Sequence, residues 1–486
     1  MLRGLLQEEI SKAAGSDVAF GISEPERAEN GDYSTNAAFK VGNAEKIAQK
    51  LRKSELVKEI MVKNKFINIF LKDEVLLKAL DEKIKFPRKK ERVNVEFVSA
   101  NPTGPLTMAN GRGGFYGDVL SNVLEKAGYD VTREYYINDA GNQIKLLGES
   151  IQAAEGKIPV KEEYYKGEYI KKLKGRSAEE AVEILLGEIK SSLKKAGIEF
   201  DEWFSEGKNL RQAGEIDKAI AEFEKKNLLD KKDGATWFGD KVFLKSNGDP
   251  TYLIVDISYQ RNKIINRKFN IAITIVGPDH HAEAEQVKKG ITALGIPENK
   301  LRILMFQVVR LMRSGKEARM SKRTGEFVTL EELLEEVGLD AARWFFLSHA
   351  PETHMDFDLE LAKERSEKNP VYYVQYAHTR MASILGKSQI PNRKSRIQEF
   401  KHPSERALVM KILRYPELLE DVSRDYQVHR LTTYAYELAQ TFSAFYRDVK
   451  VLGSEREAEL LHLVSKAKET LADSLKMMGI SQPEKM

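Results

Sequence analysis

One stretch of the chain constrains its fold more than any other, because it combines an apolar run, a tight turn and a glycine-rich helix start. The apolar run covers residues 93–98, the Pro/Gly turn covers residues 101–105, and the small residues cover 109–114. A strand, a loop and a helix N-terminus in this order point unpaired backbone N–H groups and the helix dipole at the loop. The stretch therefore predicts a phosphate-binding site at the end of a β-strand.

The chain beyond this stretch alternates strand-like with helix-like segments. Strand-like runs recur at residues 242–244, 269–277 and 301–311, and residues 282–294 have helical spacing. Such alternation is typical of an α/β fold with a doubly wound parallel sheet. The Lys/Glu-rich segment of about residues 150–235 interrupts the alternation, so we expect a helical insertion there.

Different patterns flank the α/β region on both sides. Residues 2–14 have helical spacing and residues 64–71 run apolar like a strand, which predicts a small α+β domain over residues 1–86. Later in the chain strand signals vanish and long amphipathic segments begin, so residues 369–486 are expected to form an all-helical bundle. The α/β domain then covers residues 87–368.

Composition excludes several classes of protein. The chain is 42% hydrophobic and has no apolar run near the roughly 20 residues that span a membrane, which indicates a globular protein without a membrane segment. Because it contains no cysteine, disulfides and thiolate metal sites are excluded, and a cytoplasmic location is expected. The net charge of +4 permits a nucleic-acid partner but requires any basic surface to be local.

Residues 95–118, VEFVSANPTGPLTMANGRGGFYGD, resemble the first signature of class I aminoacyl-tRNA synthetases of the arginyl type. Residues 31–42, 129–144 and 369–380 resemble segments specific to the same subgroup, so the likeness covers nearly the whole chain. The resemblance implies a Rossmann-like catalytic domain, an N-terminal domain that contacts tRNA and a bundle that reads the anticodon. It also implies ATP-dependent activation of L-arginine to arginyl-adenylate and transfer to the 3′ end of tRNA(Arg), with Mg²⁺ accompanying ATP.

A second signature lies at residues 319–323, where Arg-Met-Ser-Lys-Arg is similar to the family's Lys-Met-Ser-Lys loop. Arg319 keeps the charge of the first lysine, although a planar guanidinium is not equivalent to an ammonium. The resemblance implies that Lys322 holds the pyrophosphate leaving group. A solvated basic loop is the alternative, but the position after a strand-like run and downstream of the first signature favours the functional interpretation.

The resemblance assigns catalytic and nucleotide-binding residues to the two signatures. The implied ATP-binding residues are Gly104, Leu106, Thr107, Asn110, Gly111, Met320, Ser321 and Lys322. The implied catalytic residues are Thr107, Asn110, Arg319 and Lys322. Asp279, His280 and His281 also allow a polar helix cap or a metal site. We predict no protein metal site, because adjacent side chains point apart and no third ligand is signalled.

Arginine as a substrate requires carboxylates for its guanidinium and hydrogen-bond donors for its own carboxylate. Tyr252 and Asp256 are four residues apart and therefore lie on one face of a helix. Asp256 alone is better explained as a surface or capping carboxylate, but its coincidence with Glu96 and Tyr252 favours an arginine site. The implied arginine-binding residues are Glu96, Ser99, Ala100, Asn101, Asn110, Tyr252, Asp256, Asp279 and His280.

The C-terminal bundle mixes aromatic with basic residues, which suits stacking on unpaired anticodon bases and contacts to phosphates. A core role is the alternative for most of these aromatics, because an aromatic stripe at helical spacing usually packs inside a bundle. By the same resemblance, a polar loop of the N-terminal domain contacts the tRNA elbow, and a monomer is expected. The implied tRNA-binding residues are Tyr33, Asn36, Tyr376, Arg380, Arg430, Tyr434 and Tyr446.

The chain departs from the family where the first signature usually reads His-x-Gly-His, because residues 107–110 read Thr-Met-Ala-Asn. Thr107 offers one hydroxyl, and Asn110 offers an amide that can imitate one imidazole nitrogen, but neither carries a positive charge. Loss of one donor to a transition state typically costs about 10²–10³ in rate. Both residue types also favour a purely structural role at a helix N-cap.

Three hypotheses account for this departure. Nearby cations at Arg112, Lys316, Arg319 and Lys322 compensate, or the enzyme is slow, or the chain is a non-catalytic tRNA- or RNA-binding paralogue on the same scaffold. A nucleotidyltransferase of related fold that acts on another acceptor is a further alternative. A decayed paralogue should have lost more than one motif, so the sequence favours an active arginyl-tRNA synthetase.

Overall fold

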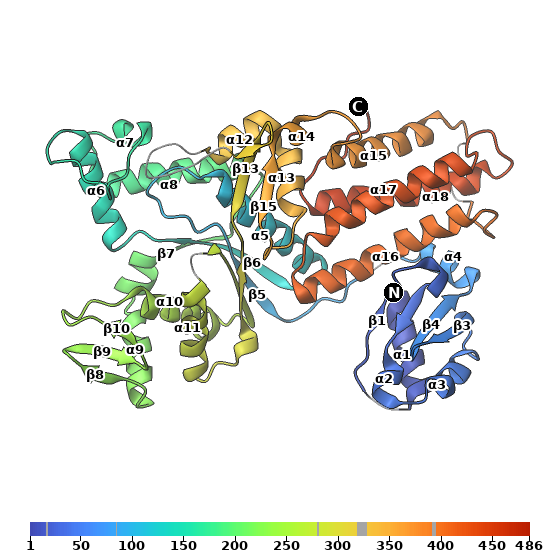
Figure 1. Ribbon diagram of the computed structural model, residues 1–486, viewed down its shortest axis with the longest axis horizontal. Helices are drawn as coiled ribbons and strands as arrows, with labels where there is room; N and C mark the ends of the chain where they lie inside the picture. The colour runs from blue at the N-terminus through green and yellow to red at the C-terminus, as the bar shows by residue number, and fades with distance from the viewer. Residues whose placement is uncertain (16–17, 84, 279–280, 318–327, 391–394) are drawn as a thin grey trace.

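The computed structural model describes residues 1–486 except 16–17, 84, 279–280, 318–327 and 391–394. Three parts follow one another along the chain (Figure 1): an N-terminal domain in blue, a central α/β domain, and a bundle of long helices in orange and red. The N-terminal domain lies beneath the bundle, and the helices of the insertion lie at the opposite end of the molecule. No helix among the described residues is both long and apolar enough to cross a membrane.

The N-terminal domain is a small antiparallel sheet covered by helices. The strand order is β1 (Ile22–Ser23), β2 (Tyr33–Thr35), β4 (Phe66–Leu71) and β3 (Val57–Lys63). The helices are α1 (Leu2–Ala14), α2 (Ala37–Val41), α3 (Ala44–Leu51) and α4 (Asp73–Asp81), with a 3₁₀ turn at Ala28–Asn30. The helix expected at 2–14 and the strand expected within 64–71 are therefore confirmed.

A five-stranded parallel sheet forms the centre of the molecule, as the strand–helix alternation predicted. Its order is β12 (Leu301–Met305), β11 (Ile271–Val276), β5 (Arg92–Glu96), β6 (Asp130–Ile137) and β7 (Glu202–Ser205). The chain starts at β5, adds β6 and β7 on one side, and then returns to add β11 and β12 on the other. The order thus reverses between β5 and β11, and ligands of open α/β sheets bind outside the carboxyl ends of the strands at such a point.

Helix α5 (Met108–Lys126) follows β5 and packs closely on the sheet. The close approach requires glycine, because a Cβ atom at Gly117 would lie 2.2 Å from the ring of Phe97. Glycine in a helix interior is normally unfavourable, so its presence here indicates that packing takes precedence over helix propensity.

Two excursions leave the sheet on either side of β7. The first contains α6 (Asn142–Ala154), α7 (Glu168–Lys172) and α8 (Ala178–Lys195). The second contains a π-helical turn at Gly207–Gln212, α9 (Glu215–Lys225), the antiparallel strands β8 (Asp230–Lys232), β9 (Ala235–Phe238) and β10 (Lys241–Leu244), α10 (Tyr252–Arg261) and a π-helical turn at Asn262–Asn266. The expected single insertion over 150–235 is therefore interrupted by a strand of the central sheet.

The strand-like run 301–311 is two strands that belong to different sheets. Residues up to Met305 form β12, and the rest begins β13 (Val309–Arg313), which pairs with β14 (Lys316–Glu317) and β15 (Met355–Asp358). Helices α11 (His281–Ala293), α12 (Leu330–Val337), α13 (Leu339–Leu347) and α14 (Leu359–Lys363), with a 3₁₀ turn at Glu298–Lys300, complete the domain. The bundle consists of α15 (Pro370–Lys387), α16 (Pro403–Asp425), α17 (Arg430–Asp448) and α18 (Glu457–Met477), as predicted.

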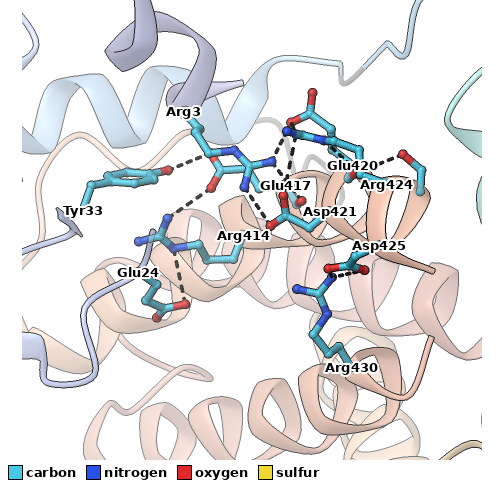
Figure 2. Close-up of polar contacts among 11 residues, drawn as sticks. Arg3, Glu24, Tyr33, Arg414, Glu417, Glu420, Asp421, Arg424, Asp425 and Arg430 are labelled. Atoms are coloured by element: carbon cyan, nitrogen blue, oxygen red, sulfur yellow. Dashed lines mark hydrogen bonds and ion pairs between the residues drawn. The ribbon is translucent and has the colours of Figure 1, made fainter. Parts of the chain in front are cut away.

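A polar network joins the N-terminal domain to helix α16 of the bundle (Figure 2). The buried Tyr33 hydroxyl donates to Glu417 Oε1 at 2.8 Å, and the backbone N–H of Arg3 donates to the same oxygen at 2.9 Å. Arg414 donates to the other oxygen of Glu417 at 3.1 Å and lies over the Tyr33 ring, 3.9 Å from its centroid. Glu417 therefore accepts hydrogen bonds from both domains at once.

Arg343 of α13 links four parts of the structure from a fully buried position, with 1% of its surface exposed. Its Nη1 atom donates to Asp118 of α5 at 2.8 Å and to the Met478 carbonyl after α18 at 3.0 Å. Its Nη2 atom donates to the carbonyls of Ala196 and Gly197, directly after α8, at 3.0 and 2.9 Å. One guanidinium thus holds the catalytic domain, the insertion and the bundle together.

Replacing Arg343 by methionine is expected to lower the free energy of unfolding by about 3–5 kcal/mol, because it leaves the Asp118 carboxylate buried without its cation. Chemical denaturation followed by tryptophan fluorescence measures the change. Arg310→Met is the matched control, since Arg310 makes a bidentate bridge to Asp356 at 2.7 and 2.9 Å on the surface. Loss of that exposed bridge should cost less than about 1 kcal/mol. Equal losses in the two variants would contradict the central role of Arg343.

Candidate active site

A cavity of about 770 Å³ opens at the carboxyl ends of β5 and β11, where the strand order reverses. Its walls come from these strands, the loop after β5, the start of α5, and helices α10 and α11. Residues from the predicted arginine set that line it are Glu96, Ser99, Ala100, Asn101, Asn110, Tyr252 and Asp256. The other two, Asp279 and His280, lie outside the described residues. Folding therefore gathers positions that are up to 160 residues apart, and arginine binding by them stays a prediction.

The loop after β5 is bent by an unusual backbone conformation. Val98 and Ser99 have φ values of 65° and 38°, in the left-handed region that a β-branched residue such as valine rarely adopts. The Ser99 hydroxyl donates to Glu96 Oε1 at 3.2 Å and accepts the backbone N–H of Tyr136 at 3.0 Å. These bonds hold the bend, and the bend turns Ser99, Ala100 and Asn101 toward the cavity.

Glu96 has a cation of its own within the protein. The Lys263 ammonium, which is fully buried, donates to Glu96 Oε2 at 2.7 Å, and the Thr274 hydroxyl donates to the same oxygen at 3.0 Å. Sequence analysis missed Lys263, although it lies seven residues after Asp256 and therefore two helical turns further along the same face. Because Lys263 balances the charge of Glu96, a cationic ligand must find its counter-charge elsewhere in the cavity.

Asp256 and Glu283 supply that charge at the end of the cavity between α10 and α11. Burial is the main cause that raises the pKa of Asp256 well above its ordinary value, and the neighbouring carboxylate of Glu283 and those of Glu96 and Glu206 raise it further. Glu206 accepts hydrogen bonds from Tyr136 and Arg211. Glu283 was not identified from the sequence, because an acidic residue in the first turn of a helix is ordinarily explained by the helix dipole.

Three amide oxygens add acceptor character to the same cavity. The side-chain oxygens of Asn138, Gln143 and Gln260 are buried and have no hydrogen-bond partner among the described residues. Gln260 uses its Nε2 atom to donate to Thr274 Oγ1 at 3.1 Å, which leaves its oxygen for a ligand. Buried acceptors without partners are costly, so their grouping here indicates that a ligand with several N–H donors satisfies them. A guanidinium or an ammonium group has that character.

The start of α5 contributes another part of the cavity wall. Thr107 is the N-cap residue of the helix, and Asn110 Oδ1 accepts both the backbone N–H and the hydroxyl of Thr107 at 2.9 Å. The structural N-cap role that the sequence allowed for Thr107 is therefore confirmed. Asn110 lines the cavity, whereas Thr107 is not among the residues that line it.

The other predicted nucleotide-binding residues pack the loop that leads to α5. Gly104 is buried, and a Cβ atom there would lie 3.2 Å from the Tyr169 ring. The Leu106 carbonyl accepts the backbone N–H of Leu330 at 2.9 Å, and a Cβ atom at Gly111 would lie 2.9 Å from the Leu330 side chain. The N–H of Met108 donates to the Val328 carbonyl at 3.0 Å. The helix start is thus bonded to the chain directly after the second signature.

The second signature itself lies outside the described residues. This applies to Arg319, Met320, Ser321 and Lys322, so their predicted roles stay predictions. Among the cations considered as compensation for the missing histidines, Arg112 donates to the carbonyls of Gln307, Ala350 and Thr353 at 2.8–2.9 Å. Burial lowers the pKa of Arg112 to about 10. Its guanidinium is therefore committed to the interior and is not available to a phosphate. Lys316 lies exposed on β14.

The residues predicted to bind tRNA separate into buried and exposed groups. Tyr434 is 4% exposed, which confirms the core role that the aromatic pattern of the bundle allowed, and its hydroxyl donates to the Lys411 carbonyl at 2.8 Å. Tyr33, which was expected in an exposed polar loop, is 0% exposed and lies in the core. Arg430 Nη2 donates to both carboxylate oxygens of Asp425 (Figure 2), and Asn36 Oδ1 accepts the N–H of Gly21 at 2.8 Å. Neither tyrosine ring is available for direct stacking with RNA in this arrangement.

An exposed aromatic–basic cluster remains on the bundle. The Arg380 guanidinium lies 5.9 Å from the ring centroid of Tyr376 and 4.7 Å from that of Tyr446. Tyr376 is 47% exposed, and the cluster joins α15 to α17. Of the predicted tRNA-binding residues, these three therefore present both a stacking surface and a positive charge to solvent.

Three family models together match nearly the whole chain. The "Arginyl tRNA synthetase N terminal domain" matches residues 1–71, the "tRNA synthetases class I (R), catalytic domain" matches residues 73–164 and 160–355, and the "DALR anticodon binding domain" matches residues 374–486. These matches follow the order of the three parts seen in the structure.

Individual proteins agree with these models. An arginine–tRNA ligase from Carboxydothermus hydrogenoformans is 38% identical, covering 97% of this chain and 95% of the relative, and one from Bacillus licheniformis is 37% identical, covering 100% and 99%. The structure of Thermus thermophilus arginyl-tRNA synthetase superposes with a TM-score of 0.82 over 100% of both chains at 24% identity, which supports the fold. The chain therefore belongs to the family of arginyl-tRNA synthetases.

Proposed function

We propose that this chain attaches L-arginine to tRNA(Arg) at the expense of ATP, by way of arginyl-adenylate. The observation that carries the proposal is the lining of the 770 Å³ cavity, which combines carboxyl groups and buried amide oxygens without a described partner with a residue from the first turn of α5. The carboxyl groups and amide oxygens suit a guanidinium, and the helix N-terminus suits a phosphate. Both groups belong to the two substrates of the first step.

The chemistry requires placement more than proton transfer. The arginine carboxylate, which is already ionised, attacks the α-phosphorus of ATP, and the bond to pyrophosphate breaks. A terminal ribose hydroxyl of the tRNA then attacks the carbonyl carbon of the adenylate, and AMP leaves. The protein contributes by aligning the reacting groups and by stabilising negative charge on the phosphates.

The arginine pocket combines the cavity residues in two groups. Asp256 and Glu283 would face the guanidinium, and Tyr252, which is 55% exposed, would lie at the mouth of the cavity. Asp279 and His280 would add to this group. Ser99, Ala100 and Asn101 would hold the α-amino and carboxylate end, where Asn110 also lies. Lys263 keeps Glu96 neutralised, so that Glu96 supports this end without adding net charge.

ATP would bind along the start of α5, with its phosphates toward Asn110 and the second signature. Gly104, Leu106, Thr107 and Gly111 belong to this stretch, and the sequence predicts that Arg319, Met320, Ser321 and Lys322 bind ATP as well. No cluster of three or more metal-ligating side chains occurs among the residues that the structure describes. Mg²⁺ commonly binds through substrate phosphates and water, so we expect it to arrive with ATP.

The tRNA would contact the helical bundle and the N-terminal domain that lies beneath it. Tyr376, Arg380 and Tyr446 form the exposed cluster on the bundle that suits unstacked anticodon bases. Hydrogen bonds hold the side chains of Asn36 and Arg430 in place. Tyr33 and Tyr434 are buried and would support this surface by packing beneath it. A cytoplasmic monomer remains our expectation.

The proposal is tested by arginine- and ATP-dependent charging of tRNA(Arg) by the full chain. We expect charging that depends on all three substrates, measured as radiolabelled arginine attached to tRNA. Binding of tRNA is measured in parallel on the same preparation. Tight tRNA binding without any charging above background would overturn the proposal and would establish the chain as a non-catalytic paralogue.

Asp256→Asn is expected to lower kcat/KM for arginine by about 10- to 150-fold, the value of a charge-assisted hydrogen bond. The loss should appear mainly in KM for arginine, while KM for ATP changes little. Glu285→Gln is the matched control, because Glu285 is on the outer face of α11 and pairs with Lys288 at 3.1 Å. A similar rise in KM for both variants would contradict the assignment.

Arginine binding is expected to weaken as pH falls. Because the pKa of Asp256 is raised by burial and by the adjacent carboxylates, this group takes up a proton at a pH where an ordinary aspartate is still ionised. The protonated form cannot pair with a guanidinium, so KM for arginine should rise as pH falls, and the rise should begin well above the pH at which an ordinary aspartate titrates. Steady-state charging measures it. The same slope in Asp256→Asn would exclude Asp256 as the titrating group.

A further inference from the structure

The Asn110 side chain can bond to Thr107 in only one orientation. The backbone N–H of Thr107 always donates, so the Asn110 atom that faces it at 2.9 Å must be the amide oxygen. The Thr107 hydroxyl donates to the same oxygen, also at 2.9 Å. The Nδ2 atom with its two N–H donors therefore points away from Thr107.

Thr107 does not supply an independent donor to a ligand in this arrangement. A threonine hydroxyl has a single proton, and that proton is used in the bond to Asn110. Thr107 does not line the cavity, whereas Asn110 does. The two positions where the family signature usually has histidines thus provide one set of outward donors, and all of them belong to the Asn110 amide.

Among the described residues of the first turns of α5, the neighbouring groups do not duplicate these donors. Arg112 is two residues further along and donates its guanidinium to three backbone carbonyls. The N–H groups of Met108 and Asn110 are bonded to Val328 and Thr107. The positive end of the α5 dipole adds to the amide at this point, because the helix runs for 19 residues from its N-cap. A neutral amide at a helix N-terminus is therefore the main side-chain donor that this wall offers.

We propose that Thr107 and Asn110 act as one unit in which Thr107 fixes the amide and Asn110 Nδ2 donates to an ATP phosphate oxygen during adenylate formation. Asn110 is then the catalytic residue and Thr107 is a positioning residue. The inference rests on the proposed function and deepens it by replacing two cationic donors with one oriented neutral donor. A purely structural helix cap is the competing explanation of the same bonds.

A double-mutant cycle distinguishes the two explanations. Asn110→Ala is expected to lower kcat/KM for ATP by about 10²–10³-fold, and Thr107→Val by about tenfold, since the amide is still present but no longer held. The double variant should be no slower than Asn110→Ala, and any change in KM for arginine should be the same in Asn110→Ala and in the double variant. If the two losses multiply, the residues act independently and the proposal is wrong.

The Asn110→Asp variant distinguishes donation by the Nδ2 atom from the structural role of the side chain at the helix N-terminus. Aspartate keeps an oxygen that accepts both bonds from Thr107 and suits the first turn of a helix, but it has no N–H to donate. We expect a thermal midpoint at least equal to that of the unmodified chain, together with a loss of charging comparable to that of Asn110→Ala. Unchanged charging in Asn110→Asp would overturn the proposal in favour of a structural cap.

Thr107→Ser provides the conservative rescue. It keeps the hydroxyl, so charging should stay within about threefold of the unmodified chain, well above Thr107→Val. Equal rates in the serine and valine variants would contradict the positioning role. All comparisons use the unmodified full chain as reference, so absence of charging in that chain would refute the proposed function and not the Thr107–Asn110 unit.

Discussion

The buried guanidinium of Arg343 is the interaction on which the rest of the structure depends. The guanidinium donates to one carboxylate, that of Asp118, and also to backbone carbonyls at the ends of the insertion and of the bundle. Backbone carbonyls at the C-terminal end of a helix have no hydrogen-bond partner within that helix, and one charged donor can bond to several of them at once. The start of α5 can hold a fixed position at the cavity because its other half is fastened in this way.

The cavity depends on a division of charge among its carboxylates. Glu96 is paired with Lys263 at 2.7 Å and so stabilises the fold, while Asp256 and Glu283 place two further carboxyl groups on the cavity wall. Burial and the neighbouring carboxylates raise the pKa of Asp256, and carboxyl groups perturbed in this way are typical of places where a ligand binds. At the start of α5, the Asn110 amide stands where the family signature usually has two ionisable histidine rings.

Much of this arrangement follows from the sequence, because local patterns specify it. The apolar run and glycines around residues 93–117 predict β5 and α5, and the spacing of Tyr252 and Asp256 predicts their common face. Strand β7 was missed because its four residues, Glu202–Ser205, lack an apolar run and form an edge of the sheet. Lys263 and Glu283 were missed because their roles arise from tertiary neighbours, which no local period encodes.

The junction around Glu417 makes the N-terminal domain an inseparable part of the molecule. Tyr33 and the Arg3 backbone come from one side, and Arg414 comes from the other, so cutting the chain near residue 86 would strip Glu417 of two of its three hydrogen-bond donors. The cut would also uncover the Arg414 guanidinium, which now lies over the Tyr33 ring. Although the chain is assembled from recognisable pieces, it is not modular in the sense that its pieces can be exchanged or removed one at a time.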